Sequence, residues 1–284
     1  MAFKTKTKIR LLKDERQTLD AKHNNILNSF IENKNSTYDA IILGNSLTRE
    51  GIDTLLLSTN LTSKIGNDRK IAYVYPDDTS IIEWFYFIKY QLLSNQDLPK
   101  RIFINFASNQ LVSERCEFEE IQRISTYAPF SELRSITLDE EFTLSESLDL
   151  FLSKLFRTYL HRERIAKRTL DVFPHYRSTI RKMNDSDYKL SVETKKHYSY
   201  KHLSKVIELA DKSGVELIFC AFPLPYEYPI VEDVKSIISN SNLCRIVNLQ
   251  DSGMFTNHDF SDGYHLNKVG AKKLTMKLIN VITQ

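Results

Sequence analysis

The sequence has few of the residues that punctuate or cross-link a chain. Its 284 residues include only seven glycines, seven prolines and three cysteines. So few glycines and prolines indicate few long loops and much regular secondary structure. Three cysteines form neither an even disulfide set nor a metal-type spacing, so Cys116, Cys220 and Cys244 are expected to be buried free thiols, which suits a reducing compartment.

Long apolar runs and a strong net charge are also missing. The longest apolar run near the N-terminus, residues 9–12, is interrupted by Arg10 and is far shorter than a signal-peptide core. No stretch approaches the roughly 20 apolar residues that a membrane helix needs. The formal net charge of +3 is small for this length and gives no reason to expect a nucleic-acid partner. We therefore expect a soluble, cytoplasmic protein without a transmembrane segment.

Motifs for metals and nucleotides are absent as well. The sequence contains no glycine-rich loop of the kind that cradles phosphates. His197 and His202 fall in a predicted helix without carboxylates at metal-ligand spacing. We expect no metal and no cofactor.

What the sequence does contain is a regular alternation of short apolar segments with helical ones. The predicted strands are residues 38–43, 70–75, 101–107, 215–222 and 245–249, and the predicted helices are 48–57, 79–93, 193–213, 230–239 and 267–282. The strands lack polar alternation, which indicates burial on both faces and a parallel sheet. With right-handed crossovers this pattern predicts an α/β, three-layer, doubly wound domain with a mainly parallel five-stranded sheet.

Two segments depart from this alternation. Residues 1–37 are polar and then weakly amphipathic, and they are predicted to be an N-terminal helical extension of a single domain at 38–284. Residues 112–200 contain no convincing strand, but apolar residues recur at helical spacing there, so a helical insertion is predicted at about 112–200. A basic stripe in it could bind an anionic ligand or could be a solvated helix face; it consists of Lys154, Arg157, His161, Arg164 and Arg168.

Ser46 is a candidate nucleophile. It follows the predicted strand at 38–43 through the turn Gly44–Asn45, and a predicted helix comes next. This position exposes the hydroxyl near the positive end of a helix. The alternative is that Ser46 is simply the N-cap of that helix.

Asp262 and His265 could activate such a serine. His265 stands just before the last predicted helix, and Asp262 is three residues upstream, close enough in a turn to hold the distal ring nitrogen. The alternative is an Asp-Gly turn beside a surface histidine. His258 and Asp259 are nearby and could compete for the two roles.

These two segments carry a resemblance to a known family. The run LGNSLTREG at 43–51 resembles the first block of the SGNH hydrolases, also called the GDSL esterase/lipase family. The run SDGYHLNKVGAKKL at 261–274 resembles their last block, in which an Asp-x-x-His pair precedes Leu, Gly-Ala and a helix. The resemblance covers about 38–110 and 214–284 and excludes the insertion.

The resemblance implies a flavodoxin-like SGNH fold and a triad of Ser46, His265 and Asp262 that attacks small-molecule, glycan or lipid esters through an acyl-enzyme. Two alternatives stay open: O-acyl transfer, for example of acetyl to a glycan hydroxyl, and a catalytically impaired binding domain.

The resemblance also implies an oxyanion hole with three donors. These are the backbone N–H of Ser46, the side chain of Asn109 in the run FASNQ at 106–110, and a backbone N–H after the second strand. A glycine usually supplies the last donor, but this sequence has none there, so Asp77 is the candidate, with Asp78 as the alternative. A carboxylate at that point opposes a developing oxyanion. The alternative for Asn109 is a helix or turn cap.

Overall fold

The computed structural model describes residues 38–65, 71–94, 98–160, 198–251 and 253–283. The chain divides into two compact units, one formed by Met1–Ser113 with Tyr200–Gln284 and the other by Glu114–Ser199. The predicted N-terminal extension at 1–37 lies outside the described residues.

The first unit is built on a five-stranded sheet. Its strands are β1 (Ala40–Leu43), β2 (Ile71–Val74), β3 (Arg101–Phe106), β4 (Glu216–Ala221) and β5 (Cys244–Asn248). Their order is β2-β1-β3-β4-β5, and every neighbouring pair is parallel. The predicted α/β fold with a parallel five-stranded sheet is therefore confirmed.

Burial on both faces of the sheet explains why its strands lack polar alternation. All four residues of β1 are buried, and so are five of the six in each of β3 and β4. In the register, Leu43 of β1 lies opposite Val74 of β2 and Ile104 of β3. Because all three strands run the same way, the segments that follow them meet at one edge of the sheet.

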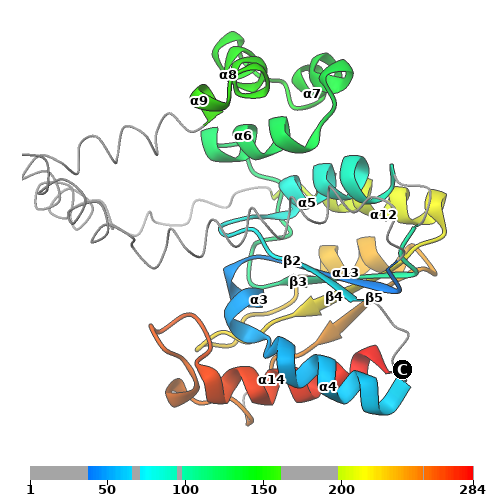
Figure 1. The fold of residues 1–284 in the computed structure, drawn as a ribbon, viewed down its shortest axis with the longest axis vertical. Helices are drawn as coiled ribbons and strands as arrows, with labels where there is room; N and C mark the ends of the chain where they lie inside the picture. Colours follow the sequence, from blue (N-terminus) through cyan, green and yellow to red (C-terminus); the bar gives the residue numbers. More distant parts are fainter. Residues whose placement is uncertain (1–37, 66–70, 95–97, 161–197, 252, 284) are drawn as a thin grey trace, which may run out of the picture. The chain divides into compact units, whose positions relative to one another are not determined.

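Helices cover both faces of this sheet (Figure 1). On one face lie α3 (Ser46–Gly51), α4 (Thr54–Ile65) and α14 (Lys268–Ile282). On the other lie α5 (Ile81–Phe87), α12 (Lys201–Ser213) and α13 (Glu232–Ser239). Two short elements complete the unit: α5 continues into the π-helical turn η1 (Ile88–Leu92), and the 3-10 turn η3 (Asn257–Asp259) precedes α14.

Two predicted helices differ from those observed. The helix predicted at 48–57 is two helices, because the chain leaves α3 at Ile52 and starts again with the Asp53 carboxylate, which accepts a hydrogen bond from the Leu56 N–H (3.0 Å). The helix predicted at 193–213 begins at Lys201, since the described residues 198–200 are not helical. It ends at Gly214, whose φ of 68° is the left-handed conformation that glycine adopts without strain.

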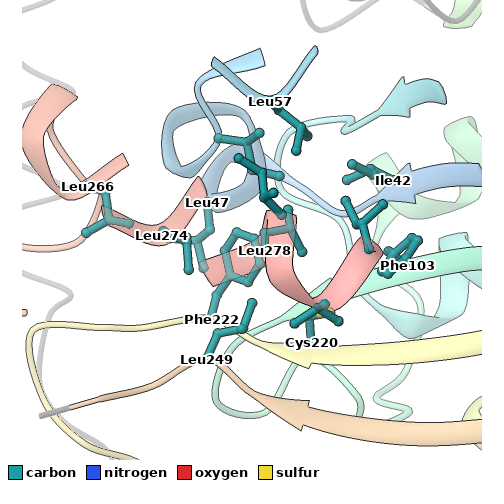
Figure 2. Packing of buried hydrophobic residues seen from close by; sticks show 14 of the residues in the cluster. Ile42, Leu47, Leu57, Phe103, Cys220, Phe222, Leu249, Leu266, Leu274 and Leu278 are labelled. Atoms are coloured by element: carbon teal, nitrogen blue, oxygen red, sulfur yellow. The ribbon is translucent and has the colours of Figure 1, made fainter. Parts of the chain in front are cut away.

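A hydrophobic cluster fixes α3, α4 and α14 to the sheet (Figure 2). Ile42, Phe103 and Cys220 from the strands face Leu274 and Leu278 of α14, and all five are fully buried. Burying one such side chain stabilises a fold by about 1.5–3 kcal/mol. The helices next to the β1 turn therefore rest on a closely packed base.

The second unit is helical in its described part. It contains α6 (Phe118–Tyr127), the 3-10 turn η2 (Phe130–Glu132), α7 (Leu133–Asp139), α8 (Leu144–Leu155) and α9 (Arg157–Leu160). Thr143 and Glu146 form a capping box at the start of α8, and Arg115 pairs with Glu146. Among the apolar residues that recur here at helical spacing, Leu148 and Leu155 are more than half exposed, whereas α8 buries Leu150 and Ser153.

No helix in the described part of the chain is both long enough and apolar enough to cross a membrane.

Candidate active site

The turn between β1 and α3 is tightly packed. The Gly44 N–H donates to the Val74 carbonyl of β2 (3.0 Å), which holds the turn against the neighbouring strand. A Cβ on Gly44 would lie 1.9 Å from the Thr48 Oγ1, so no side chain fits there without displacing α3. The backbone therefore turns sharply after β1 and delivers Ser46 at the carboxyl edge of the sheet.

Asn45, not Ser46, is the N-cap of α3. Its side-chain oxygen accepts the Leu47 N–H (3.1 Å), and its amide donates to the Thr79 carbonyl (3.1 Å). Asn45 is only 3% exposed, so this cap is part of the packed interior. The cap interpretation of Ser46 is thereby wrong, and its hydroxyl is available for other contacts.

A hairpin-like loop carries Asp262 and His265. Phe260 and Leu266 form an antiparallel bridge, and inside it the Ser261 N–H donates to the His265 carbonyl (2.8 Å). Gly263 sits in the loop at a φ of 77°, a left-handed conformation that a residue with a Cβ adopts only under strain. The loop is thus closed on itself just before α14.

Asp262 holds both the backbone and the ring of His265. One carboxylate oxygen accepts the backbone N–H groups of Tyr264 (3.0 Å) and His265 (2.7 Å). The other lies 2.8 Å from the His265 Nδ1. The backbone N–H and then the ring of His265 lower the pKa of Asp262 to about 2. The ionised carboxylate only accepts, so in the neutral imidazole Nδ1 carries the proton and Nε2 presents a lone pair.

That lone pair faces Ser46. The His265 Nε2 lies 3.0 Å from the Ser46 Oγ, across 219 residues of sequence. The structure therefore brings Ser46, His265 and Asp262 into one hydrogen-bonded chain. The His265 side chain is about a quarter exposed, so part of the ring is open to solvent.

The competing pair, His258 and Asp259, has other partners. The Asp259 carboxylate is buried and accepts from the Thr256 N–H (2.8 Å) and the Lys273 ammonium (2.9 Å). The His258 carbonyl accepts the side-chain amide of Asn267, the N-cap of α14 (2.6 Å). These contacts tie the loop to α14, which is a structural role.

The other two expected oxyanion donors, Asn109 and Asp77, follow the two strands that flank β1 in the sheet. Asn109 lies in the turn after β3 with its side chain exposed, and its carbonyl accepts the Val112 N–H (2.8 Å). Asp77 lies in the turn after β2, where its carboxylate pairs with the Arg49 guanidinium of α3. Both turns leave the sheet at the edge that holds Ser46.

Two residues near the triad were not singled out from the sequence. The Tyr264 ring meets the His265 ring edge-on, with centroids 5.5 Å apart and planes at 80°. Arg49 stands one helical turn after Ser46. Its position in the run LGNSLTREG signalled that it shares a face of the helix with Ser46, but nothing in the sequence named its partner.

The predicted basic stripe is described only in part. The Lys154 ammonium donates to the Ala128 carbonyl (2.6 Å), and burial lowers the pKa of this amine. The side chain of Arg157, and His161, Arg164 and Arg168, lie outside the described residues. In the parts of the chain that the structure describes, no group of three or more His, Cys, Asp or Glu side chains is placed to hold a metal ion.

No protein-family model and no curated protein matches the sequence. Solved structures similar to the chain include a lipase from a goat rumen metagenome, with 11% identity, a TM-score of 0.41, and coverage of 85% of this chain and 96% of that chain. Another is a catalytic mutant of Axe2, an acetylxylan esterase from Geobacillus stearothermophilus, with 10% identity, a TM-score of 0.43, and coverage of 87% and 94%.

A third similar structure is an α/β hydrolase enzyme from the metagenome of Lake Arreo, Spain, with 9% identity, a TM-score of 0.39, and coverage of 88% and 98%. The α/β fold with its all-parallel sheet is the one that the resemblance to the SGNH hydrolases implied. The function rests on the geometry of the site.

Proposed function

We propose that the chain is a serine-dependent hydrolase of the SGNH type, which cleaves carboxylic esters through an acyl-enzyme. The observation that carries this proposal is the chain of contacts from Ser46 Oγ to His265 Nε2 (3.0 Å) and from His265 Nδ1 to Asp262 (2.8 Å). A serine hydroxyl is a poor nucleophile unless a base lies within hydrogen-bond reach, and this arrangement supplies one.

Acylation begins when Ser46 attacks the ester carbonyl. The Ser46 Oγ forms a bond to the carbonyl carbon while His265 Nε2 takes the hydroxyl proton. The imidazolium that forms is stabilised by the ionised Asp262 on its other side. The tetrahedral intermediate then expels the alcohol, which leaves with the proton from Nε2, and the acyl group remains on Ser46.

The negative charge on the carbonyl oxygen needs hydrogen-bond donors. The Ser46 N–H at the first turn of α3, the Asn109 amide and the Asp77 N–H are the groups we assign to it. Removing one such donor typically lowers turnover by about 10²–10³-fold.

Deacylation repeats these steps with water. His265 Nε2 takes a proton from water as its oxygen bonds to the acyl carbon, and the proton returns to the Ser46 Oγ as the acid leaves. A sugar hydroxyl that reached the acyl-enzyme in place of water would give acyl transfer by the same groups.

A fluorophosphonate probe tests the proposal, because it phosphonylates only an activated serine. We expect the wild type to be labelled at Ser46 and Ser46→Ala not to be labelled. Ser58→Ala, which removes an exposed serine of α4, is the matched control and should be labelled like the wild type. An unlabelled wild type, or equal labelling of Ser46→Ala, would exclude the catalytic proposal and favour a binding domain.

A further inference from the structure

An ion pair links the helix of the nucleophile to the turn after β2. Arg49 lies on α3 one turn after Ser46, and its guanidinium pairs with the Asp77 carboxylate and with the neighbouring Glu50 (2.9 Å). The Arg49 side chain is 20% exposed and that of Asp77 is 42% exposed, so the pair is partly shielded from water. Residues three apart on a helix share a face, which puts this pair on the side of Ser46.

The same turn is bonded to the residues just before Ser46. The Thr79 carbonyl accepts the Asn45 amide (3.1 Å), and the Thr79 hydroxyl donates to the Pro76 carbonyl (2.9 Å). The turn that carries Asp77 is therefore held against the start of α3, the helix that begins with Ser46.

A carboxylate in that place works against the reaction. The transition state gains a negative charge, and an uncompensated carboxylate nearby raises its energy. Arg49 supplies the opposite charge. Burial alone lowers the pKa of the guanidinium, but hydrogen bonds to Asp77 and Glu50 outweigh burial and the net shift is upward, so Arg49 stays charged.

We propose that Arg49 is a positioning residue, which holds the Asp77 carboxylate, fixes the turn after β2 and offsets the negative charge beside the oxyanion. The inference rests on the proposed function. It explains how a chain with aspartates instead of a glycine in this turn keeps a working oxyanion hole. If the role is electrostatic, the loss of kcat on removing Arg49 depends on whether residue 77 is charged.

Steady-state kinetics with p-nitrophenyl acetate test this dependence. Arg49→Gln keeps a hydrogen-bonding side chain but removes the positive charge that pairs with Asp77, so kcat should fall about 10- to 100-fold with little change in KM. Asp77→Asn should raise kcat about two- to tenfold, because it removes the opposing charge. The double variant should recover most of the loss seen in Arg49→Gln. In about 1 M NaCl the loss should shrink, because salt screens the charge.

The control is Lys277→Gln, which removes the cation of a similarly exposed ion pair with Asp251 and should leave kcat unchanged. Thermal unfolding checks that each variant folds. If Arg49→Gln does not fold, Asp77→Asn alone decides, since a fall in its kcat overturns the inference.

A purely structural role predicts no recovery in the double variant, and that result, or an unaffected Arg49→Gln, would overturn the inference while the hydrolase proposal stands. A wild type no faster than Ser46→Ala overturns both.

Discussion

At the scale of single residues, the two oxygens of Asp262 do different work. One is held by two backbone N–H groups, and this fixes the carboxylate in place whatever the ring does. The other accepts from the His265 Nδ1, which selects the tautomer with a lone pair on Nε2. The His265 ring is thus oriented by a carboxylate that is itself oriented by the backbone.

The order of activity losses among single variants follows from these contacts. His265→Ala removes the base, and we expect a loss in kcat of about 10⁴-fold or more, nearly as large as that of Ser46→Ala. Asp262→Ala should cost less, since the ring keeps its nitrogen facing Ser46 for part of the time. Ester hydrolysis rates measure all three.

His258→Ala is the control for this series. It removes an exposed histidine of the same loop, whose backbone carbonyl accepts the Asn267 amide, so activity should stay within about twofold of the wild type. A loss from His258→Ala as large as that from His265→Ala would mean that the base is assigned to the wrong histidine.

Local spacing in the sequence was enough to predict the contact between Asp262 and His265, because a turn brings side chains three residues apart close together. It was not enough to choose between cap and nucleophile at Ser46. Asn45 and Ser46 are both good N-cap residues, and only the path of the turn decides which one bonds the Leu47 N–H. The Arg49–Asp77 pair spans 28 residues and two elements, so no local pattern could reveal it.

At the scale of elements, the turn from β1 into α3 depends on Gly44. Its φ is not left-handed, so the requirement for glycine comes from space alone: the Thr48 Oγ1 and Cβ would lie 1.9 and 2.8 Å from an added Cβ. Thr48 is fully buried on α3, and its Cβ is too close to an added Cβ for a change of rotamer alone to relieve the clash.

Gly44→Ala should therefore destabilise the first unit and misplace the nucleophile. We expect a loss in the free energy of unfolding of about 1–3 kcal/mol, typical of overpacking, together with a lower kcat. Urea denaturation and ester kinetics measure the two effects. Gly253→Ala is the matched control, since its Cβ would meet only the Asp251 carboxylate at 3.5 Å and should change neither quantity. A fully stable and active Gly44→Ala variant would show that α3 can shift to make room for the added Cβ at little cost in stability.

Element boundaries were predicted less well than element types. All five strands were found, since buried apolar runs are distinctive. The helix predicted at 48–57 divides at Asp53, whose backbone N–H donates to the Thr275 hydroxyl of α14 (2.9 Å). That tertiary hydrogen bond is made with a residue 222 positions away, so the sequence around Asp53 carries no signal for it.

At the scale of the whole molecule, the three cysteines are divided between the two units, so their reactivity measures how stably each unit is folded. Cys116 belongs to the second unit, and Cys220 and Cys244 to the first. All three are buried free thiols, as predicted, and burial raises the pKa of Cys220 to about 12.

The native protein should therefore react slowly with a thiol reagent such as Ellman's reagent, because reaction needs an exposed thiolate. In denaturant three equivalents should react at once. Cys116→Ser removes the thiol of the second unit, so this variant should react with one equivalent fewer in denaturant. A fast equivalent in the native wild type would show that one unit opens readily.

The architecture of the first unit could be predicted as a whole because its pattern of strands and helices is regular. The packing of the second unit could not be predicted, because apolar spacing along a helix does not show which of its residues will be buried. Leu148 and Leu155 have the periodicity of a core stripe, yet they are exposed, and Leu150 and Ser153 are the residues that α8 buries.

The distance of 219 residues between Ser46 and His265 has a consequence for synthesis. Ribosomes add about 5–20 residues per second, so the histidine emerges roughly 10–40 s after the serine. During that interval the nascent chain carries the proposed nucleophile without its proposed base. On the proposed mechanism the hydroxyl becomes reactive only when the segment around His265 has been made and has docked, so a chain that stops before His265 should be unreactive.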